Sequence, residues 1–417
     1  MTAGLPASFR LDGTARRLSL DPREPSFVQD PYVAYRAVLA ETPVAWWEQL
    51  GLWCVFGHAE GDQLLRDRRF GRELLHVTTR EALGWPAPAP HRRDFDAVDA
   101  HSLLEREPPV HTRLRRLINR AFAPRAVERM RAEITAIAHE LVSAFPSGPF
   151  DLLAHYATPV AIRVITRFLG VPDTMAPQLL DWSHRMVAMY GVARTHAVEV
   201  DANAAARDFA AWVRALVVER RQHPGADLLS ELIAVRDAGE ALDDDELVST
   251  VILLLNAGHE ATVHALGNAV HVLLTSGQTP AGLLATADQR DRLVEELLRV
   301  RPPLHLFKRY ALEALELFGI PFRTGDQVAV ILGAAGQDPR LLNCPHRFDP
   351  SRADPHHLGF GAGIHYCVGA PLARLELSVA LEVLFAGCPA LTLVDSPRMR
   401  DSWHFHGLEQ LMVQRPS

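Results

Sequence analysis

The spacing of apolar residues predicts a chain built mainly from helices. Apolar positions at helical intervals recur through the segments 130–144, 160–169 and 204–221. The longest such pattern runs from Asp243 to Ser276 without a proline, and Asp243 and Glu246 have the spacing of a helix capping box. At about 1.5 Å per residue, this helix would extend for roughly 50 Å and cross a whole domain.

Shorter runs of β-branched and aromatic residues predict a few strands beside these helices. Two strands are expected at 44–47 and 52–56, joined through Gly51, and others near 304–310, 320, 328 and 389–416. Residues 71–109 hold five prolines without a sustained period, which indicates a long loop with at most short helices. The predicted fold class is therefore mainly α with small β-sheets.

Composition and charge argue against several classes of protein. The chain has 417 residues, of which 48% are hydrophobic, and its net charge of −7 at pH 7 argues against a nucleic-acid binder. Four cysteines without zinc-site spacing suggest a reducing compartment. The N-terminal residues lack a continuous apolar stretch, and apolar runs elsewhere are too short for a membrane anchor. We therefore expect a cytoplasmic protein.

One cysteine lies where a thiolate is expected. Gly361 and Gly363 allow a tight turn just before Cys367, and a helix is predicted to begin at Pro371. Free N–H groups at the start of that helix, and the positive end of its dipole, favour a thiolate over a thiol. A lone cysteine is more often an inert buried side chain, whereas a fixed thiolate is a metal ligand or a nucleophile.

The residues around Cys367 resemble the heme-binding loop of the cytochrome P-450 family. The frame Phe-x-x-Gly-x-His-x-Cys-x-Gly is matched in full by Phe360, Gly363, His365, Cys367 and Gly369. The resemblance implies that Cys367 ligates the iron of heme b, and that Phe360, His365 and Gly369 also bind the cofactor. It further implies the cytochrome P-450 fold, with the long central helix over the heme, in one domain over 1–417 with an N-terminal extension at 1–30.

The middle of the long helix is unusual for a buried segment. It contains a glycine, which costs up to ~1 kcal/mol in a helix, and a carboxylate, whose burial without a partner costs more. In the family's Ala-Gly-x-Glu-Thr-Thr segment, Ala257, Gly258 and Glu260 match, whereas Ala261 replaces the first threonine. The resemblance implies an oxygen site here, where Gly258 leaves room for dioxygen and Glu260 manages protons. Without that hydroxyl, a substrate hydroxyl, Thr262 or water relayed from Glu260 would have to supply protons.

A run of basic residues follows the loop, on a helix predicted over 108–122. Such a run is usually a solvated surface. The segment nevertheless resembles the family's Pro-Pro-x-His-Thr-Arg-x-Arg-Arg, which implies that Arg113 and Arg116 point away from the heme, towards an electron-donating partner. The heme propionates are assigned by the same resemblance to His111, Arg115, Arg309 and His365.

Three further segments match the family less specifically. Glu296 and Arg299 resemble a buried structural Glu-x-x-Arg pair, with Arg347 as its third member. The segment 172–200 has methionines and aromatic residues at helical spacing, which is typical of ordinary core, although the resemblance makes it a candidate lid. A histidine in 403–408 stands where the family commonly has arginine, and we interpret it as structural.

The matched elements occur in the family's order and imply a heme-thiolate monooxygenase. It would insert one oxygen atom into a small organic substrate, with electrons from NAD(P)H delivered through a ferredoxin or flavodoxin and its reductase. Two alternatives stay open. The missing threonine also allows a peroxide-driven peroxygenase or a rearrangement enzyme, and a heme-binding sensor without turnover is the third interpretation.

Overall fold

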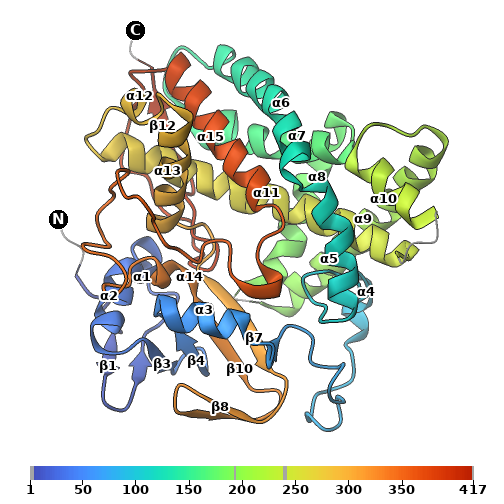
Figure 1. Cartoon of the computed structure of the whole chain (residues 1–417), viewed down its shortest axis with the longest axis vertical. Coiled ribbons are helices and arrows are strands. Elements are labelled where there is room, and N and C mark those ends of the chain that lie inside the picture. The colour runs from blue at the N-terminus through green and yellow to red at the C-terminus, as the bar shows by residue number, and fades with distance from the viewer. Residues whose placement is uncertain (1–3, 192–193, 238–241, 416–417) are drawn as a thin grey trace.

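Helices form most of the molecule (Figure 1). The computed structural model describes residues 4–191, 194–237 and 242–415, so two residues of the predicted lid and the last two residues of the chain lie outside the described ranges. The prediction of a mainly helical chain is confirmed. The helices are α1 Pro25–Gln29, α2 Tyr32–Glu41, α3 His58–Arg66, α4 Arg93–Asp99, α5 Val110–Ala121, α6 Pro124–Ser143, α7 Thr158–Leu169, α8 Ala176–Val187, α9 His196–Gln222, α10 Leu228–Asp237, α11 Asp244–Thr275, α12 Pro280–Leu283, α13 Ala287–Val300, α14 Leu332–Ala335 and α15 Ala370–Gly387.

Helix α11 passes through the middle of the helical region (Figure 1). It begins with the predicted capping box, in which the Asp243 side chain accepts a hydrogen bond from the Glu246 N–H at 2.7 Å and Glu246 accepts one from the Asp243 N–H at 3.1 Å. Helices α7, α8, α9 and α15 all pack against it. Because neighbours cover it on several sides, the helix is apolar around most of its circumference.

The strands form three small sheets. They are β1 Arg10–Asp12, β2 Arg17–Ser19, β3 Val44–Trp47, β4 Leu52–Val55, β5 Phe70–Gly71, β6 Phe150–Asp151, β7 Leu306–Ala311, β8 Leu315–Leu317, β9 Ile320–Phe322, β10 Gln327–Ile331, β11 Thr392–Leu393 and β12 Met412–Gln414. The largest sheet has the order β1-β2-β3-β4-β10-β7-β5, and the others are β11-β12-β6 and β8-β9. The predicted small sheets are therefore confirmed. Strands β1 and β2 come from the predicted N-terminal extension, which thus contributes an edge of the largest sheet.

The register of this sheet sets the position of Arg309. Strand β10 lies parallel to β4, with Ala329 opposite Cys54, and antiparallel to β7, with Val328 opposite Arg309. The β3–β4 hairpin turns at Gly51, which has a φ of 66°.

Across the described residues, every helix is too short or too polar to cross a lipid bilayer.

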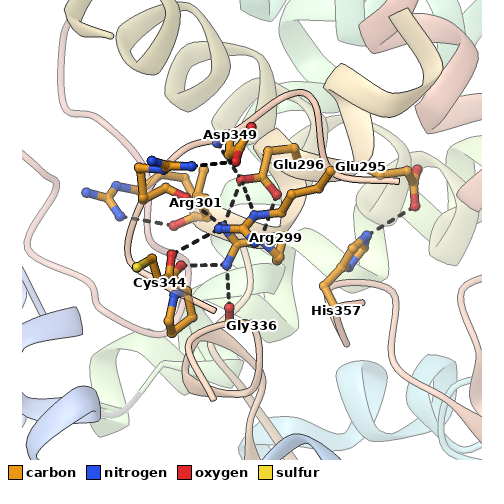
Figure 2. Close-up of polar contacts among 12 residues, drawn as sticks. Glu295, Glu296, Arg299, Arg301, Gly336, Cys344, Asp349 and His357 are labelled. Atoms are coloured by element: carbon orange, nitrogen blue, oxygen red, sulfur yellow. Dashed lines mark hydrogen bonds and ion pairs between the residues drawn. The ribbon is translucent and has the colours of Figure 1, made fainter. Parts of the chain in front are cut away.

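Helix α13 carries a completely buried ion pair near its end (Figure 2). Arg299 donates from Nε and Nη2 to the two carboxylate oxygens of Glu296 at 2.7 and 2.8 Å, and neither residue is exposed to solvent. Glu296 also accepts a hydrogen bond from the Asp349 N–H at 2.8 Å. The remaining N–H groups of Arg299 bind the backbone carbonyls of Gly336, Pro345 and Arg347. The pair therefore fixes the chain between 336 and 349, which leads into the cysteine loop.

The prediction that Arg347 is the third member of this cluster is wrong for its side chain. Arg347 contributes its carbonyl, but its side chain is 66% exposed and pairs with Asp349 at 2.8 Å. The side chain that approaches Glu296 belongs to Arg352, whose Nε lies 3.4 Å from Oε1. A loop has no periodicity that tells which of two nearby arginines turns inward, so the sequence alone did not distinguish them.

We expect the substitution Arg299→Ala to lower the free energy of unfolding by about 3–5 kcal/mol, because it leaves the Glu296 carboxylate buried without a partner. The pair Glu128 and Arg131 is a matched control, since it has the same i, i+3 spacing but its side chains are 59% and 45% exposed. Arg131→Ala should change stability by less than ~1 kcal/mol. Urea unfolding of both variants measures the difference, and equal losses would contradict the structural role of the buried pair.

Candidate active site

All twelve residues predicted for the site line one internal cavity of about 880 Å³. They reach it from α5, α11, β7 and the loop before α15, which are far apart in the sequence. They are His111, Arg115, Ala257, Gly258, Glu260, Ala261, Thr262, Arg309, Phe360, His365, Cys367 and Gly369. Their common location is a finding of the structure, whereas the role of each remains a prediction.

A tight loop holds Cys367 in place. Gly361 and Gly363 have φ values of 70° and 71°, and the Cys367 N–H donates to the Phe360 carbonyl at 2.9 Å. A side chain at Gly363 would also collide with the backbone carbonyl of Leu65, since its Cβ would lie 2.2 Å from that oxygen. The sequence "Gly-x-Gly" thus serves both the turn and its close approach to α3.

Burial and neighbouring groups shift the pKa of the Cys367 thiol in opposite directions. Burial raises the pKa of the Cys367 thiol, while hydrogen bonds from the N–H groups of Gly369 and Ala370 lower it, as does Arg115. The predicted N–H donors are therefore present, but burial outweighs them in the protein alone. A metal ion that binds the sulfur would remove the proton, because a coordinating thiol is deprotonated.

Two imidazoles lie together at one side of the cavity. The rings of His111 and His365 are 4.5 Å apart, and His365 Nε2 is 2.9 Å from Glu107 Oε1. The Nε2 atom of His111 is buried and has no hydrogen-bond partner, and burial lowers the pKa of His111 to about 4. Glu107 had no signal in the sequence, because its role depends on a contact with a loop 258 residues away.

Two arginines face the same space without a carboxylate. Arg309 is 2% exposed, donates only to the neighbouring Lys308 carbonyl, and stacks at 4.7 Å on Phe307. Burial lowers the pKa of Arg309 to about 9, and nearby Arg72 lowers it further. Burial also lowers the pKa of Arg115, whose Nε donates to Asn119 at 2.9 Å.

These groups match the chemistry of heme b. Its two propionates would neutralise buried arginines and accept a hydrogen bond from an unpartnered imidazole, as carboxylates bound by Arg commonly do. Its iron would bind the cysteine sulfur. The neighbouring Arg113 does not line the cavity and forms an ion pair with Glu246 of α11, and Arg116 is exposed. That these two arginines face an electron-donating partner stays a prediction.

The central helix borders the cavity through the predicted segment. A Cβ at Gly258 would lie 2.5 Å from the side chain of Ile165 of α7, which also lines the cavity. The missing side chain of Gly258 thus permits close packing of two helices, and its role in leaving room for dioxygen stays a prediction. The hydroxyl of Thr262 donates to the Gly258 carbonyl at 3.1 Å, one turn earlier in the helix.

Glu260 is the centre of a polar cluster that the sequence only partly indicated. Its Oε1 lies 3.1 Å from Arg400 Nη1 and 3.3 Å from His264 Nε2, and its Oε2 lies 3.2 Å from His184 Nε2. Burial alone would raise the pKa of Glu260, but its hydrogen bonds with His184 and His264 hold that pKa well below the usual range. His264 could have been suspected from its i+4 position, whereas Arg400 is 140 residues away.

The rest of the cavity wall combines apolar and charged residues. Met186, Met189 and Tyr190 from the predicted lid line the cavity, but Trp182 does not and instead stacks on Phe209 at 5.0 Å.

The charged residues of this wall had not been singled out in the sequence. Tyr190 donates to Asp99 Oδ1 at 3.3 Å, and Arg72 forms an ion pair with Glu105. The wall also contains Arg92, Asp96, Arg194, Lys308 and Glu376.

The segment 403–408 contributes differently from residue to residue. His404 and Phe405 line the cavity, whereas His406 is 1% exposed and its Nε2 donates to the Val28 carbonyl at 3.1 Å. His406 therefore holds the C-terminal loop against the N-terminal region. These contacts fit the interpretation of a histidine in this segment as a structural residue.

Comparisons with known proteins agree with this architecture. A sequence model described as Cytochrome P450 matches residues 290–403. Cytochrome P450 monooxygenase PikC of Streptomyces venezuelae is 35% identical, over 89% of this chain and 87% of its own length. The 6-deoxyerythronolide B hydroxylase of Saccharopolyspora erythraea is 35% identical, over 94% and 98%. The solved structure of P450BioI in complex with an acyl carrier protein that carries hexadec-9Z-enoic acid has a TM-score of 0.86, with 32% identity over 94% of this chain and 100% of that one.

The predicted fold, heme b cofactor and oxygen-inserting activity are confirmed by these relatives. Three of the similar sequences are named as a monooxygenase or a hydroxylase, and they cover 89%, 94% and 93% of this chain. The electrons come from NAD(P)H through redox partners, as in the family. This chain therefore belongs to the cytochrome P450 family, as a bacterial-type heme-thiolate monooxygenase.

Proposed function

We propose that Cys367 is the axial ligand of the heme iron in this enzyme, and that His111, Arg115, Arg309 and His365 bind the propionates. The observation that carries the proposal is a pair of arginines on the cavity that contains the cysteine, Arg309 buried and Arg115 half-buried, neither of which forms an ion pair with a carboxylate of the described residues. Phe360 and Gly369 complete the loop around the sulfur. When bound through a thiolate, heme b activates dioxygen for insertion of one oxygen atom into a substrate.

Ala257, Gly258, Glu260, Ala261 and Thr262 border the oxygen site in this proposal. Thr262 is a weak candidate for proton delivery, because its hydroxyl already donates to the Gly258 carbonyl. The neighbours of Glu260 keep it ionised. Glu260 can therefore pass a proton to the oxygen site only after it has accepted that proton from another group. We therefore assign proton delivery to Glu260 with ordered water or a substrate hydroxyl.

The substrate is a largely apolar organic molecule with polar groups at one end. Support comes from the apolar wall near Met186 and Met189 and from the charged residues Asp99, Glu105 and Arg72 on the same cavity. A relative of this chain is named for hydroxylation of 6-deoxyerythronolide B, so cyclic polyketides are a reasonable first class to screen.

The electron donor is a ferredoxin or flavodoxin with its reductase. Arg116 on the exposed side of α5 supports this proposal, because a basic surface attracts an acidic electron carrier.

The cysteines form no disulfide bonds; they are Cys54, Cys344, Cys367 and Cys388. Free thiols support a location in a reducing compartment, namely the cytoplasm.

The test of heme ligation is the absorption spectrum of the reduced protein under carbon monoxide. We expect a strongly red-shifted Soret band for the wild type, because a thiolate opposite the gas donates electron density to the iron. Cys367→Ser should remove this band while Cys388→Ser, which changes a buried cysteine elsewhere, keeps it. A band that survives Cys367→Ser would refute the assignment.

Proton delivery is tested by adding the missing hydroxyl. With substrate, redox proteins and NADPH, Ala261→Thr should lower the fraction of reducing equivalents lost as hydrogen peroxide by about twofold or more, because it adds a proton donor at the oxygen site. Thr262→Val is the matched control, since it removes a hydroxyl that is already bound to the Gly258 carbonyl. An unchanged peroxide fraction for Ala261→Thr would mean that Ala261 is not at the proton-delivery position.

Asp99 predicts a pH dependence of substrate binding. Burial raises its pKa to about 7, with a further increase from Glu105 and a decrease from Arg72. Asp99 is therefore mostly neutral at pH 6 and mostly ionised at pH 8, and a substrate that covers it with an uncharged polar group and excludes water favours the neutral form. We expect the dissociation constant, measured by the heme spin-state shift, to rise several-fold from pH 6 to pH 8. Asp99→Asn should abolish the dependence and Asp96→Asn should keep it, whereas a constant that falls with pH would indicate a cationic substrate.

A further inference from the structure

A second cluster of potential ligands lies on the far side of Glu260 from the cavity. His184 of α8 and His259 of α11 meet the carboxylate there, and neither histidine lines the cavity. Their two ring nitrogens and one carboxylate oxygen all lie within 4.8 Å of one another. The mechanism proposed above uses Glu260 but neither of these imidazoles.

His259 has the hydrogen bonding of a metal ligand without a metal. The side chain is 1% exposed, and its Nδ1 lies 3.1 Å from the Leu255 carbonyl. A carbonyl only accepts, so Nδ1 carries the hydrogen and Nε2 presents its lone pair. Nε2 is buried without a hydrogen-bond partner, and burial lowers the pKa of this imidazole, which keeps it neutral. Histidines that bind metals commonly donate their other N–H to a backbone carbonyl in this way.

The spacing of the ligand atoms suits a tetrahedral ion. Zinc bonds of about 2.0–2.1 Å place neighbouring ligand atoms roughly 3.3–3.4 Å apart. Glu260 Oε2 lies 3.2 Å from His184 Nε2 and 3.6 Å from His259 Nε2. The two imidazole nitrogens lie within 4.8 Å of each other, and His184, whose side chain is 53% exposed, is the ligand that would have to move towards the ion.

The two carboxylate oxygens of Glu260 face different residues. Oε1 faces Arg400 and His264, whereas Oε2 faces His184 and His259. An ion at Oε2 therefore leaves the contact with Arg400 intact. The exposed His184 gives the site an opening to solvent, through which the ion enters and a water molecule completes four ligands.

We propose that His184, His259 and Glu260 form a zinc-binding site between α8 and α11. Bound zinc links the lid helix to the central helix and occupies the carboxylate that lies between the site and the cavity. Its effect on turnover rests on the proton-delivery role proposed for Glu260. Binding itself depends only on the three ligands.

Zinc binding is measured by calorimetric titration of the chelator-treated holoenzyme with ZnCl₂. We expect one ion per chain, and His184→Ala and His259→Ala should each weaken binding by about tenfold or more, as loss of a ligand does. His139→Ala changes an exposed histidine on α6 and should leave binding unchanged. The carbon monoxide band of each variant verifies that it folds and holds heme.

X-ray absorption at the zinc edge gives a second measurement, with imidazole nitrogen expected at about 2.0 Å. Binding that neither His184→Ala nor His259→Ala weakens would overturn the site, as would an equal loss in His139→Ala. Zinc should also raise the fraction of electrons lost as peroxide in the wild type. Binding at the site with an unchanged peroxide fraction would retain the zinc site and refute only the role of Glu260 in proton delivery.

Discussion

The free-energy cost of burying a charged side chain away from water explains how the buried arginines of this protein are partnered. Arg299 is as deeply buried as Arg309, yet the two differ in their partners. Arg299 binds a carboxylate and three carbonyls, so its charge is compensated within the fold. Arg309 donates to one carbonyl and stacks on an aromatic ring, and it forms no ion pair with a described residue, although nearby Glu107 and Glu105 raise its pKa. The first arginine therefore belongs to the framework, whereas the charge of the second is only partly compensated, and the proposed propionate would complete its compensation.

The framework and the cavity are connected through the cysteine loop. Arg299 and Glu296 fix the chain from 336 to 349, and the close contact of Gly363 with Leu65 fixes the turn before Cys367. The opposite wall is α11, which its capping box and the neighbouring helices hold in position. Contacts that lie outside the cavity thus hold Cys367 and the middle of α11 on the same cavity. A change in these contacts would move Cys367 without altering a residue of the cavity wall.

The sequence predicted the residues of the cavity better than their contacts. The central helix, its capping box, Cys367 and the basic residues of α5 were all recognisable, because each has a local pattern. Side-chain direction in loops has no such pattern, which is why Arg352 rather than Arg347 approaches Glu296. Packing between distant helices is also invisible in one sequence. The close approach of Gly258 to Ile165 of α7, for example, depends on two helices that are about 90 residues apart.

One departure from the family pattern on α11 transfers the supply of protons to other groups. Ala261 removes a hydroxyl beside the oxygen site, and the next hydroxyl, on Thr262, is committed to the helix backbone. Glu260 is ionised and has no proton of its own to give. His184, His259 and His264 all lie against this carboxylate, and the His184 side chain is 53% exposed to solvent. The carboxylate that would relay protons in this proposal is therefore connected to solvent through His184, and the unpartnered Nε2 of His259 beside it also suits a metal ion.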